Sequence, residues 1–275
     1  MQKCKIGFIG GGNMAGSLIG GLISDGFAAE KIWVAEPNQQ RREELAGRFS
    51  LHTSTDNLAL VNEVDVVVLA VKPQAMQAVC QEISTAVQTK RPLLISVAAG
   101  LRSADLNRWL GGNQAIVRSM PNTPALVQSG ATALFANAQV SDSQAELAES
   151  IMRAVGLTLW LDDETLMDAV TAISGSGPAY FFLLMEMLEQ TGSQMGLAPK
   201  NARLLALQTA FGAAKMALES QDDAATLRAR VTSPGGTTER AIGLLEQGEI
   251  RTLFAQALDG ARQRAAELAD QLGAE

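Results

Sequence analysis

The sequence predicts an α/β fold in which an open, doubly wound sheet is followed by an all-α domain. Three observations predict it. Short apolar runs alternate with stretches of helical length over residues 1–161, as in a parallel sheet covered by helices. A glycine-rich turn joins the first apolar run to the first helical stretch. After Leu161 the strand-like runs stop, and helices rich in alanine, leucine and methionine follow.

The elements of the first domain, predicted as residues 1–161, follow from these patterns. The run Asp65–Val71 is almost entirely valine, leucine and alanine, which is typical of a parallel strand buried on both faces. Pro73 can open the helix after it, and Ser103 can cap a later one. The expected strands are residues 5–9, 31–35, 65–71, 92–97, 115–118, 132–135 and 158–160. The expected helices are residues 14–23, 39–48, 73–87, 103–110 and 141–154.

The second domain, predicted as residues 162–275, is expected to contain helices alone. They cover residues 162 to about 174, 179 to about 195, 199 to beyond 216, 224 to about 230, and two segments after 236. The stretch Phe181–Leu188 is apolar on almost every side and is interrupted only by Glu186. Such a helix is usually buried all round, either in its own core or against a second subunit. We predict a helical homodimer.

The stretch Ile6–Ser24 carries no charge and follows two lysines, so it superficially matches a secretory signal. Its many glycines and Asn13 argue against that, because a signal core or a spanning helix of ~20 residues is predominantly apolar. A flexible linker is also disfavoured, since the stretch is patterned as strand, turn and helix. We therefore expect neither a targeting signal nor a membrane segment.

The turn Gly10–Ala15 fits the pattern G-x-G-x-x-G/A, which follows a strand and opens a helix in dinucleotide-binding domains. Gly10 permits the tight turn, Gly12 leaves room for a pyrophosphate, and Ala15 lets the helix pack closely. The N–H groups and dipole of the helix start favour the phosphate charge. The first domain is thus predicted to be Rossmann-like. Its expected cofactor contacts here are Gly10, Gly12, Asn13, Met14 and Ala15.

The end of the second expected strand carries both kinds of group that distinguish the nicotinamide cofactors. An acidic residue there, Glu36, is typical of a hydrogen bond to the ribose of NAD, whereas an arginine can receive the 2′-phosphate of NADP. Arg41 and Arg42 are such arginines, or equally the solvated face of a helix. The residues alone leave NAD and NADP open.

Composition argues against several other classes of protein. The net charge of -7 and the lack of a Lys/Arg run disfavour nucleic-acid binding. Cys4 and Cys80 form neither a CxxC pair nor a metal-ligand spacing, so we expect a reduced, cytoplasmic protein without a metal. His52 is the only histidine, and a surface or packing role is expected for it.

Further loops are expected at the same edge of the sheet as the glycine turn. Ala70–Pro73, Ala98–Gly100 and Met120–Asn122 each follow a predicted strand, and ligands of doubly wound sheets bind at the carboxyl ends of strands. A second glycine-rich loop, Val231–Glu239, interrupts the helical half. It is either a simple turn between helices or a loop whose amides receive an anion.

With these residues in view, the sequence resembles the pyrroline-5-carboxylate reductase family, whose members catalyse the last step of proline biosynthesis. The motifs FIGGGNMA, AVKPQ, SVAAG, MPNTPA, SGSGPAY and VTSPGGTTERAI occur in the family's order across essentially the whole chain. The resemblance implies hydride transfer from NADPH, or from NADH, to the imine carbon of 1-pyrroline-5-carboxylate. It also implies a homodimer, or a higher homo-oligomer built from dimers, that acts on a small molecule.

The resemblance implies roles for particular residues. Loop amides would hold the substrate carboxylate, and Thr238 would be the catalytic residue that hydrogen-bonds the ring nitrogen. Asn57 would approach the adenosine ribose or its phosphate, whereas Glu36 is less typical of a strictly NADP-selective site. The implied substrate-binding residues are Ser233, Gly235, Gly236, Thr237 and Thr238. The further expected cofactor contacts are Glu36, Asn57, Ala70, Val71, Lys72, Pro73, Ala98, Met120, Pro121 and Asn122.

Two other functions stay open on the residues alone. A hydroxy-acid dehydrogenase would use a lysine of the helical domain, but Lys200 begins a predicted helix and Lys215 lies inside one. A non-catalytic dinucleotide-binding protein would keep the first glycine turn without needing the loop Pro234–Thr238. Activity on a hydroxy acid but not on the cyclic imine would favour the dehydrogenase. Nucleotide binding without turnover of any imine would favour the binding protein.

Overall fold

The computed structural model describes residues 4–274, which form two compact units. Unit 1 holds the described residues up to Ser176 and those from Ala261 onward, and unit 2 is Gly177–Gly260. In the structure, residues 162–176 and the end of the last helix therefore belong to unit 1. The division of function between 1–161 and 162–275 stays a prediction.

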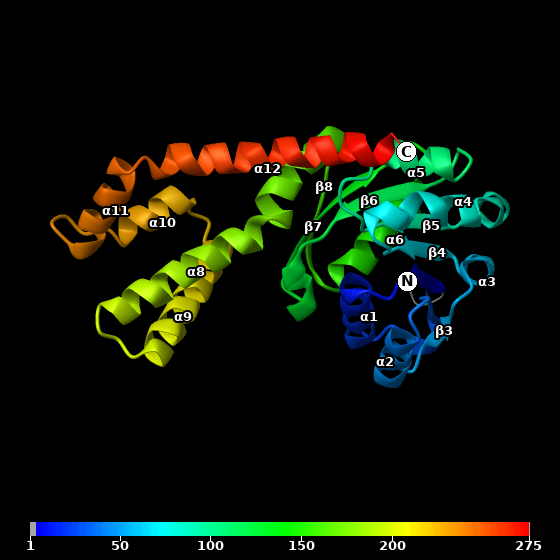
Figure 1. Ribbon diagram of the computed structural model, residues 1–275, viewed down its shortest axis with the longest axis horizontal. Coiled ribbons are helices and arrows are strands. Elements are labelled where there is room, and N and C mark those ends of the chain that lie inside the picture. Colours follow the sequence, from blue (N-terminus) through cyan, green and yellow to red (C-terminus); the bar gives the residue numbers. More distant parts are fainter. Residues whose placement is uncertain (1–3, 275) are drawn as a thin grey trace. The chain divides into compact units, whose positions relative to one another are not determined.

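Unit 1 is built on an eight-stranded sheet with the order β3-β2-β1-β4-β5-β6-β7-β8 (Figure 1). The pairs from β3 to β6 are parallel, β7 is antiparallel to β6, and β8 is parallel to β7. The winding of the chain reverses at β1, which lies between β2 and β4. The strands are β1 Ile6–Ile9, β2 Ile32–Ala35, β3 His52–Ser54, β4 Val66–Leu69, β5 Leu93–Ser96, β6 Ile116–Met120, β7 Gly130–Ala136 and β8 Gly156–Trp160.

Helices connect these strands, which confirms the predicted Rossmann-like domain. They are α1 Asn13–Ser24, α2 Gln39–Phe49, α3 Asn57–Glu63, α4 Pro73–Lys90, α5 Ser103–Trp109, α6 Asp142–Arg153 and α7 Met167–Val170. Short turns of 3-10 helix lie at η1 Ala29–Lys31, η2 Thr123–Val127 and η3 Glu164–Leu166. A π-helical turn, η4 Thr171–Gly175, follows α7.

Alternate side chains of each central strand enter two separate hydrophobic cores, one on each face of the sheet. Ile6 and Phe8 of β1 pack with α1 and α6, whereas Ile9 packs with α3, α4 and α5. These three side chains are at most 1% exposed. Burying a side chain of this size contributes about 1.5–3 kcal/mol. Both faces of the sheet therefore require a cover of helices, as the continuous apolar run in β4 predicts.

Two elements of unit 1, β3 and α3, were not predicted. β3 is only three residues long, and its side chains are His52, Thr53 and Ser54. It lies at the edge of the sheet, where an apolar alternation is not needed. The ring of His52 stacks on Trp33 with 4.6 Å between ring centroids, so His52 has the packing role expected of it.

Unit 2 is helical, as predicted, and the described residues after 161 contain no strand. Its helices are α8 Gly177–Gln194, α9 Pro199–Glu219, α10 Ala224–Arg230, α11 Thr237–Gln247 and the first part of α12 Ile250–Gly273. Within it, α8 and α9 lie side by side (Figure 1). The interruption expected between the helices at 162–174 and 179–195 is short: a π-helical turn runs to Gly175, and α8 begins at Gly177.

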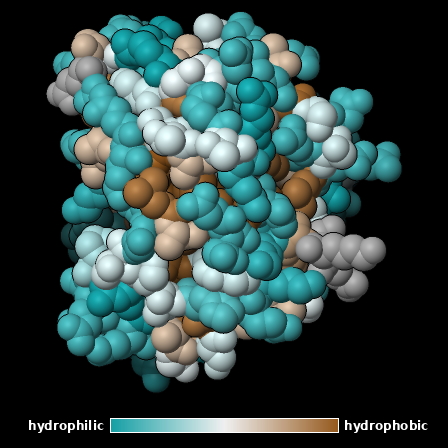
Figure 2. Space-filling model, turned by 90° about the vertical axis from the view of Figure 1, so that its right-hand side faces the viewer, coloured by the Kyte–Doolittle hydropathy of each residue, from teal (hydrophilic) through white to brown (hydrophobic). Residues whose placement is uncertain are grey.

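Large apolar side chains of α8 are exposed in the single chain, with Phe181 at 60% and Phe182 at 62%. Figure 2 shows a face of the protein that is mainly hydrophilic, with hydrophobic residues in small areas. Apolar exposure of this kind over a helix is typical of an interaction site, such as a contact with another protein surface. Among the described residues, no helix is long and apolar enough to cross a bilayer.

Candidate active site

The glycine turn lies at the carboxyl end of β1, where the winding of the sheet reverses. Gly10 has a φ of +97°, and a Cβ there would stand 2.6 Å from the carbonyl oxygen of Ala70. Only glycine suits this backbone and this close approach. The N–H of Gly10 donates to the carbonyl oxygen of Ala35 at 2.8 Å. Gly10 is thus hydrogen-bonded to the end of β2 and packed closely against the residue that follows β4.

Gly12 has open space in front of it, because a Cβ there would meet no atom within 4 Å. It is the N-cap of α1 and offers no side chain to the N–H groups of the first turn, which begins with Asn13 and Met14. Free N–H groups at a helix start are the donors that a phosphate needs. Ala15 is buried beneath them. This space and these donors fit the diphosphate of a nicotinamide dinucleotide.

A cleft of ≈ 520 Å³ opens beside Gly12. Glu36 reaches the turn from the end of β2: its Oε2 accepts the N–H of Gly11 at 2.7 Å, and its Oε1 accepts the N–H of Asn38 at 2.9 Å. Arg41 of α2 donates from Nε to the carbonyl oxygen of Gly11 at 2.5 Å. Charged groups therefore hold both polar atoms of the Gly11 backbone. The residues around the cleft are Gly12, Glu36, Asn38, Gln40, Arg41, Glu44 and Lys72.

Other predicted cofactor residues lie at the same carboxyl edge, because the strands from β1 to β6 are parallel. The N–H of Ala70 donates to the carbonyl oxygen of Ile9 at 2.8 Å, which joins β4 to β1 just before the turn. Lys72 is the N-cap of α4 and Pro73 is its first residue. The other predicted residues of this edge are Val71 after β4, Ala98 after β5, Met120 at the end of β6, and Pro121 after it.

Two predicted cofactor residues use their side chains to hold other segments. Asn122 accepts the N–H of Ala131 at 2.9 Å and donates to the carbonyl oxygen of Ser174 in the π-helical turn at 3.2 Å. Asn57, at the start of α3, donates to Glu82 at 3.0 Å and lies outside the lining of the cleft beside Gly12. Their contact with a cofactor stays a prediction.

Glu164 was missed by sequence reasoning, which treated it only as part of a helix start. Its carboxylate accepts the N–H and the hydroxyl of Ser103 at 2.7 and 2.6 Å, and it pairs with Arg118 at 3.0 Å. Ser103 is therefore not the expected N-cap. It is the first residue of α5, and its backbone N–H, which has no acceptor within the helix, donates to Glu164. These contacts of Glu164 with Ser103 and Arg118, called the clamp below, join η3 to α5 and β6. In the chain, α5 follows the predicted loop Ala98–Gly100, and β6 ends at the predicted loop Met120–Asn122. No local sequence pattern predicts these contacts, because Ser103 lies 61 residues and Arg118 lies 46 residues before Glu164 in the chain.

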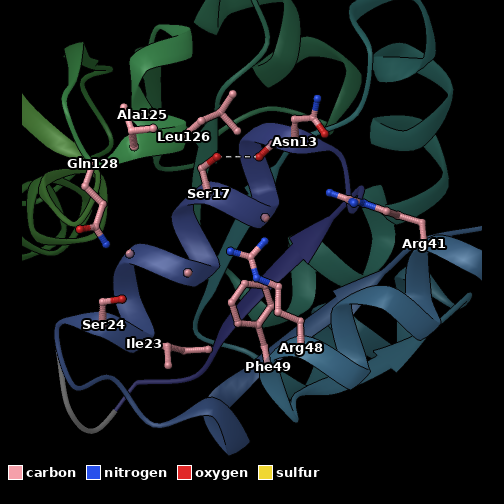
Figure 3. Close-up of a pocket in the computed structure, with 14 residues that line it drawn as sticks. Asn13, Ser17, Ile23, Ser24, Arg41, Arg48, Phe49, Ala125, Leu126 and Gln128 are labelled. Carbon is pink, nitrogen blue, oxygen red and sulfur yellow. Dashed lines mark hydrogen bonds between the residues drawn. The ribbon is translucent and has the colours of Figure 1, made fainter.

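A second cavity of ≈ 600 Å³ runs along α1 (Figure 3). Asn13 lies at one end of it, and its carbonyl oxygen accepts the hydroxyl of Ser17 at 2.8 Å. Gly16 and Gly20 face the Arg41 and Phe49 side chains of α2. The glycine spacing of α1 thus makes room beside α2 and keeps this cavity open.

The second glycine-rich loop lies in unit 2. The N–H of Gly236 donates to the carbonyl oxygen of Ser233 at 3.0 Å, and Gly235 has a φ of +71°. With Pro234 before it, this is the geometry of a type II turn. Gly236 is the N-cap of α11, and Thr237 and Thr238 are the first residues of that helix. The loop therefore presents a helix start without a side-chain cap, as the first glycine turn does.

Comparison with known proteins shows which proteins the chain resembles. Residues 5–100 match the family described as NADP oxidoreductase coenzyme F420-dependent, and residues 164–268 match pyrroline-5-carboxylate reductase dimerisation. A pyrroline-5-carboxylate reductase of Pseudomonas aeruginosa is 52% identical over 99% of this chain and 100% of its own length. That of Haemophilus influenzae is 44% identical over 98% of each chain.

Solved structures agree with these relatives. A pyrroline-5-carboxylate reductase of Coxiella burnetii superposes with a TM-score of 0.93 at 47% identity, covering 97% of this chain and 98% of that one. A pyrroline carboxylate reductase of Plasmodium falciparum, with NADP bound, superposes with a TM-score of 0.87 at 29% identity, covering 98% and 99%. The parallel sheet, its glycine turn and these matches define the class of the protein as an oxidoreductase with a nicotinamide cofactor.

Within that class, the chain belongs to the pyrroline-5-carboxylate reductase family. The match to the dimerisation family supports a homo-oligomer, and it agrees with the exposed apolar side chains of α8.

Proposed function

We propose that this protein reduces 1-pyrroline-5-carboxylate to L-proline with NADPH, as the last step of proline biosynthesis in the cytoplasm. The observation that carries the proposal is a likeness to reductases of this name over the whole chain, at up to 52% identity. The glycine turn with open space at Gly12 supports the cofactor half of it. The exposed apolar side chains of α8 support a homodimer, from which higher homo-oligomers can be built.

The cofactor is proposed to lie at the carboxyl edge of the parallel strands. Gly10, Gly12 and Ala15 would shape the turn around the diphosphate, and the first N–H groups of α1 would bind it. When bound, the reduced nicotinamide supplies a hydride. The contacts proposed along the same edge are Asn13, Met14, Glu36, Asn57, Ala70, Val71, Lys72, Pro73, Ala98, Met120, Pro121 and Asn122.

The substrate is proposed to bind at the second glycine-rich loop. Backbone N–H groups between Ser233 and Thr238 would bind its carboxylate, and the hydroxyl of Thr238 would hydrogen-bond the ring nitrogen. A protonated imine is already electrophilic, so the protein needs no nucleophile of its own. Its task is to hold the imine carbon in line for hydride, which is catalysis by orientation.

Formation of proline from 1-pyrroline-5-carboxylate, measured with NADPH and with NADH, tests the proposal directly. We expect turnover with both cofactors and a higher kcat/KM with NADPH. Turnover of a hydroxy acid without any turnover of the cyclic imine would contradict the proposed substrate.

Thr238→Ala is expected to lower kcat for imine reduction by about ten- to a hundredfold, the size of one lost hydrogen bond to a charged group. The affinity for NADPH should stay unchanged, because the substitution removes a hydroxyl from the start of α11 and not from the glycine turn. Steady-state kinetics and NADPH titration measure the two effects. A wild-type rate of proline formation by Thr238→Ala would show that Thr238 is not a catalytic residue.

Arg41→Ala is expected to raise KM for both cofactors, because the bond from Arg41 Nε to the Gly11 carbonyl oxygen is lost from the glycine turn. KM for NADPH should rise by about tenfold more than KM for NADH, because only NADPH also loses a guanidinium bond to its 2′-phosphate. Arg41 lines the cleft beside Gly12 together with Lys72, at the place where the 2′-phosphate of NADP is received in this fold. Glu36 in the same cleft is the feature that keeps NADH acceptable.

The matched control for this experiment is Arg48→Ala, which removes the same charge from the same helix and away from that cleft. Its ratio of kcat/KM values for the two cofactors should equal that of the wild type. An unchanged ratio in the Arg41 variant would contradict the proposed phosphate contact.

A further inference from the structure

Glu239, the third residue of α11, folds back over the start of its own helix. Its Oε2 accepts the N–H of Gly235 at 2.8 Å. This is close to a capping box, in which an acidic residue at this position bonds the N–H of the N-cap. Here the bond goes one residue further back, because the N-cap is Gly236 and its N–H is already used by the carbonyl oxygen of Ser233.

These two bonds decide which loop amides are left for a ligand. The N–H groups of Gly235 and Gly236 both have acceptors within the loop. The next N–H groups belong to Thr237 and Thr238, and the N-cap Gly236 has no side chain to bond them. An anion at this loop therefore meets a pair of amides at the helix start and not the glycine amides before it.

The first glycine turn shares one feature with this loop. Glu36 accepts the N–H of Gly11 at 2.7 Å, and Gly11 directly precedes Gly12, the N-cap of α1, which again has no side chain. In both loops a glutamate carboxylate accepts the backbone N–H of the residue just before an N-cap glycine. Both helix starts are left open to an anionic guest: the cofactor diphosphate in one and the substrate carboxylate in the other.

We propose that Glu239 is a positioning residue for the substrate: by holding the Gly235 amide, it fixes the turn and assigns the carboxylate to the amides of Thr237 and Thr238. This proposal rests on the proposed function. The hydrogen-bond acceptor on residue 239 is what matters, more than its charge. A negative charge beside a carboxylate site weakens binding by itself, so an uncharged acceptor should serve the turn at least as well.

Steady-state kinetics of Glu239→Ala and Glu239→Gln test this. Glu239→Ala is expected to raise KM for 1-pyrroline-5-carboxylate by about tenfold, the scale of one hydrogen bond, with kcat within about twofold of wild type and KM for NADPH unchanged. Glu239→Gln keeps an acceptor oxygen for the Gly235 N–H and should restore KM to the wild-type value or below it. Glu246→Ala, which removes a carboxylate from the far end of α11, should leave all three parameters unchanged.

Every other result contradicts at least one of the two proposals. If the wild type forms no proline, the proposed function fails and this inference falls with it. If the wild type is active and Glu239→Ala keeps its KM for the imine, the inference alone is overturned. Glu239→Gln as impaired as Glu239→Ala would also overturn it, because the charge and not the hydrogen bond to Gly235 would then be responsible.

Discussion

Replacing Gly12 with aspartate is expected to abolish NADPH binding and leave the fold intact. A Cβ at this position meets nothing within 4 Å, so the protein itself has room for the new side chain. Aspartate is also a favourable N-cap residue, and Gly12 is the N-cap of α1. The new carboxylate would fill the space proposed for the diphosphate. At ~4 Å from it, the repulsion between unit charges is about 4 kcal/mol near a protein surface, or roughly a thousandfold in affinity.

Titration of the variant with NADPH, followed by the fluorescence of the reduced nicotinamide, measures this loss. The matched control is Gly47→Asp, which makes the same change on α2 at a glycine that also faces open space. The control should bind NADPH like the wild type. Binding by the Gly12 variant within tenfold of wild type would place the diphosphate elsewhere.

Replacing Glu164 with alanine is expected to lower the free energy of unfolding by about 3–5 kcal/mol, the usual cost of leaving one member of a buried ion pair alone. Arg118, its partner, has a side chain only 5% exposed, so water cannot replace the lost carboxylate. The change also leaves the N–H of Ser103 without its acceptor at the start of α5. The clamp between η3, α5 and β6 should open.

Thermal unfolding at a fixed protein concentration compares this variant with Glu246→Ala, which breaks an exposed pair with Arg251. The exposed change should leave the midpoint close to that of the wild type, because surface ion pairs contribute little. Glu164→Gln should fall between wild type and Glu164→Ala, since it can still accept from Ser103 and cannot neutralise Arg118. Equal midpoints for the two alanine variants would show that the clamp does not stabilise unit 1.

The parts of the fold that were predictable are those whose signal lies within a few neighbouring residues. The apolar runs of β1, β4 and β5, the glycine turn after β1 and the helical second half all have this property. β3 was missed because three polar residues at a sheet edge carry no such signal. The interruption predicted between residues 174 and 179 is shorter in the structure, where the π-helical turn runs to Gly175 and α8 begins at Gly177. Glycine, serine and proline suggested a longer break, although proline is well tolerated in the first turn of a helix.

The candidate site divides in the same way. Gly10, Gly12 and Ala15 could be predicted because each meets a requirement of the turn itself. Gly10 has a positive φ, Gly12 faces open space, and Ala15 is buried where the helix packs closely. The sequence showed that residues 36 and 239 are glutamates, but it did not show which backbone N–H groups their carboxylates accept. Glu36 bonds an amide 25 residues away, and Glu239 bonds one only four residues away whose partner depends on the shape of the turn.

The sequence by itself determined the alternation of strands and helices, the phosphate-type turn and, through its motifs, the family, because each of these is encoded by residues close together in the chain. Only the tertiary structure decided the order of the strands, the clamp of Glu164 on Ser103 and Arg118, and which amides of the two loops are already bonded. The physical reason is that a hydrogen bond or ion pair depends on the distance between its atoms. Between residues far apart in the chain, that distance is set by packing.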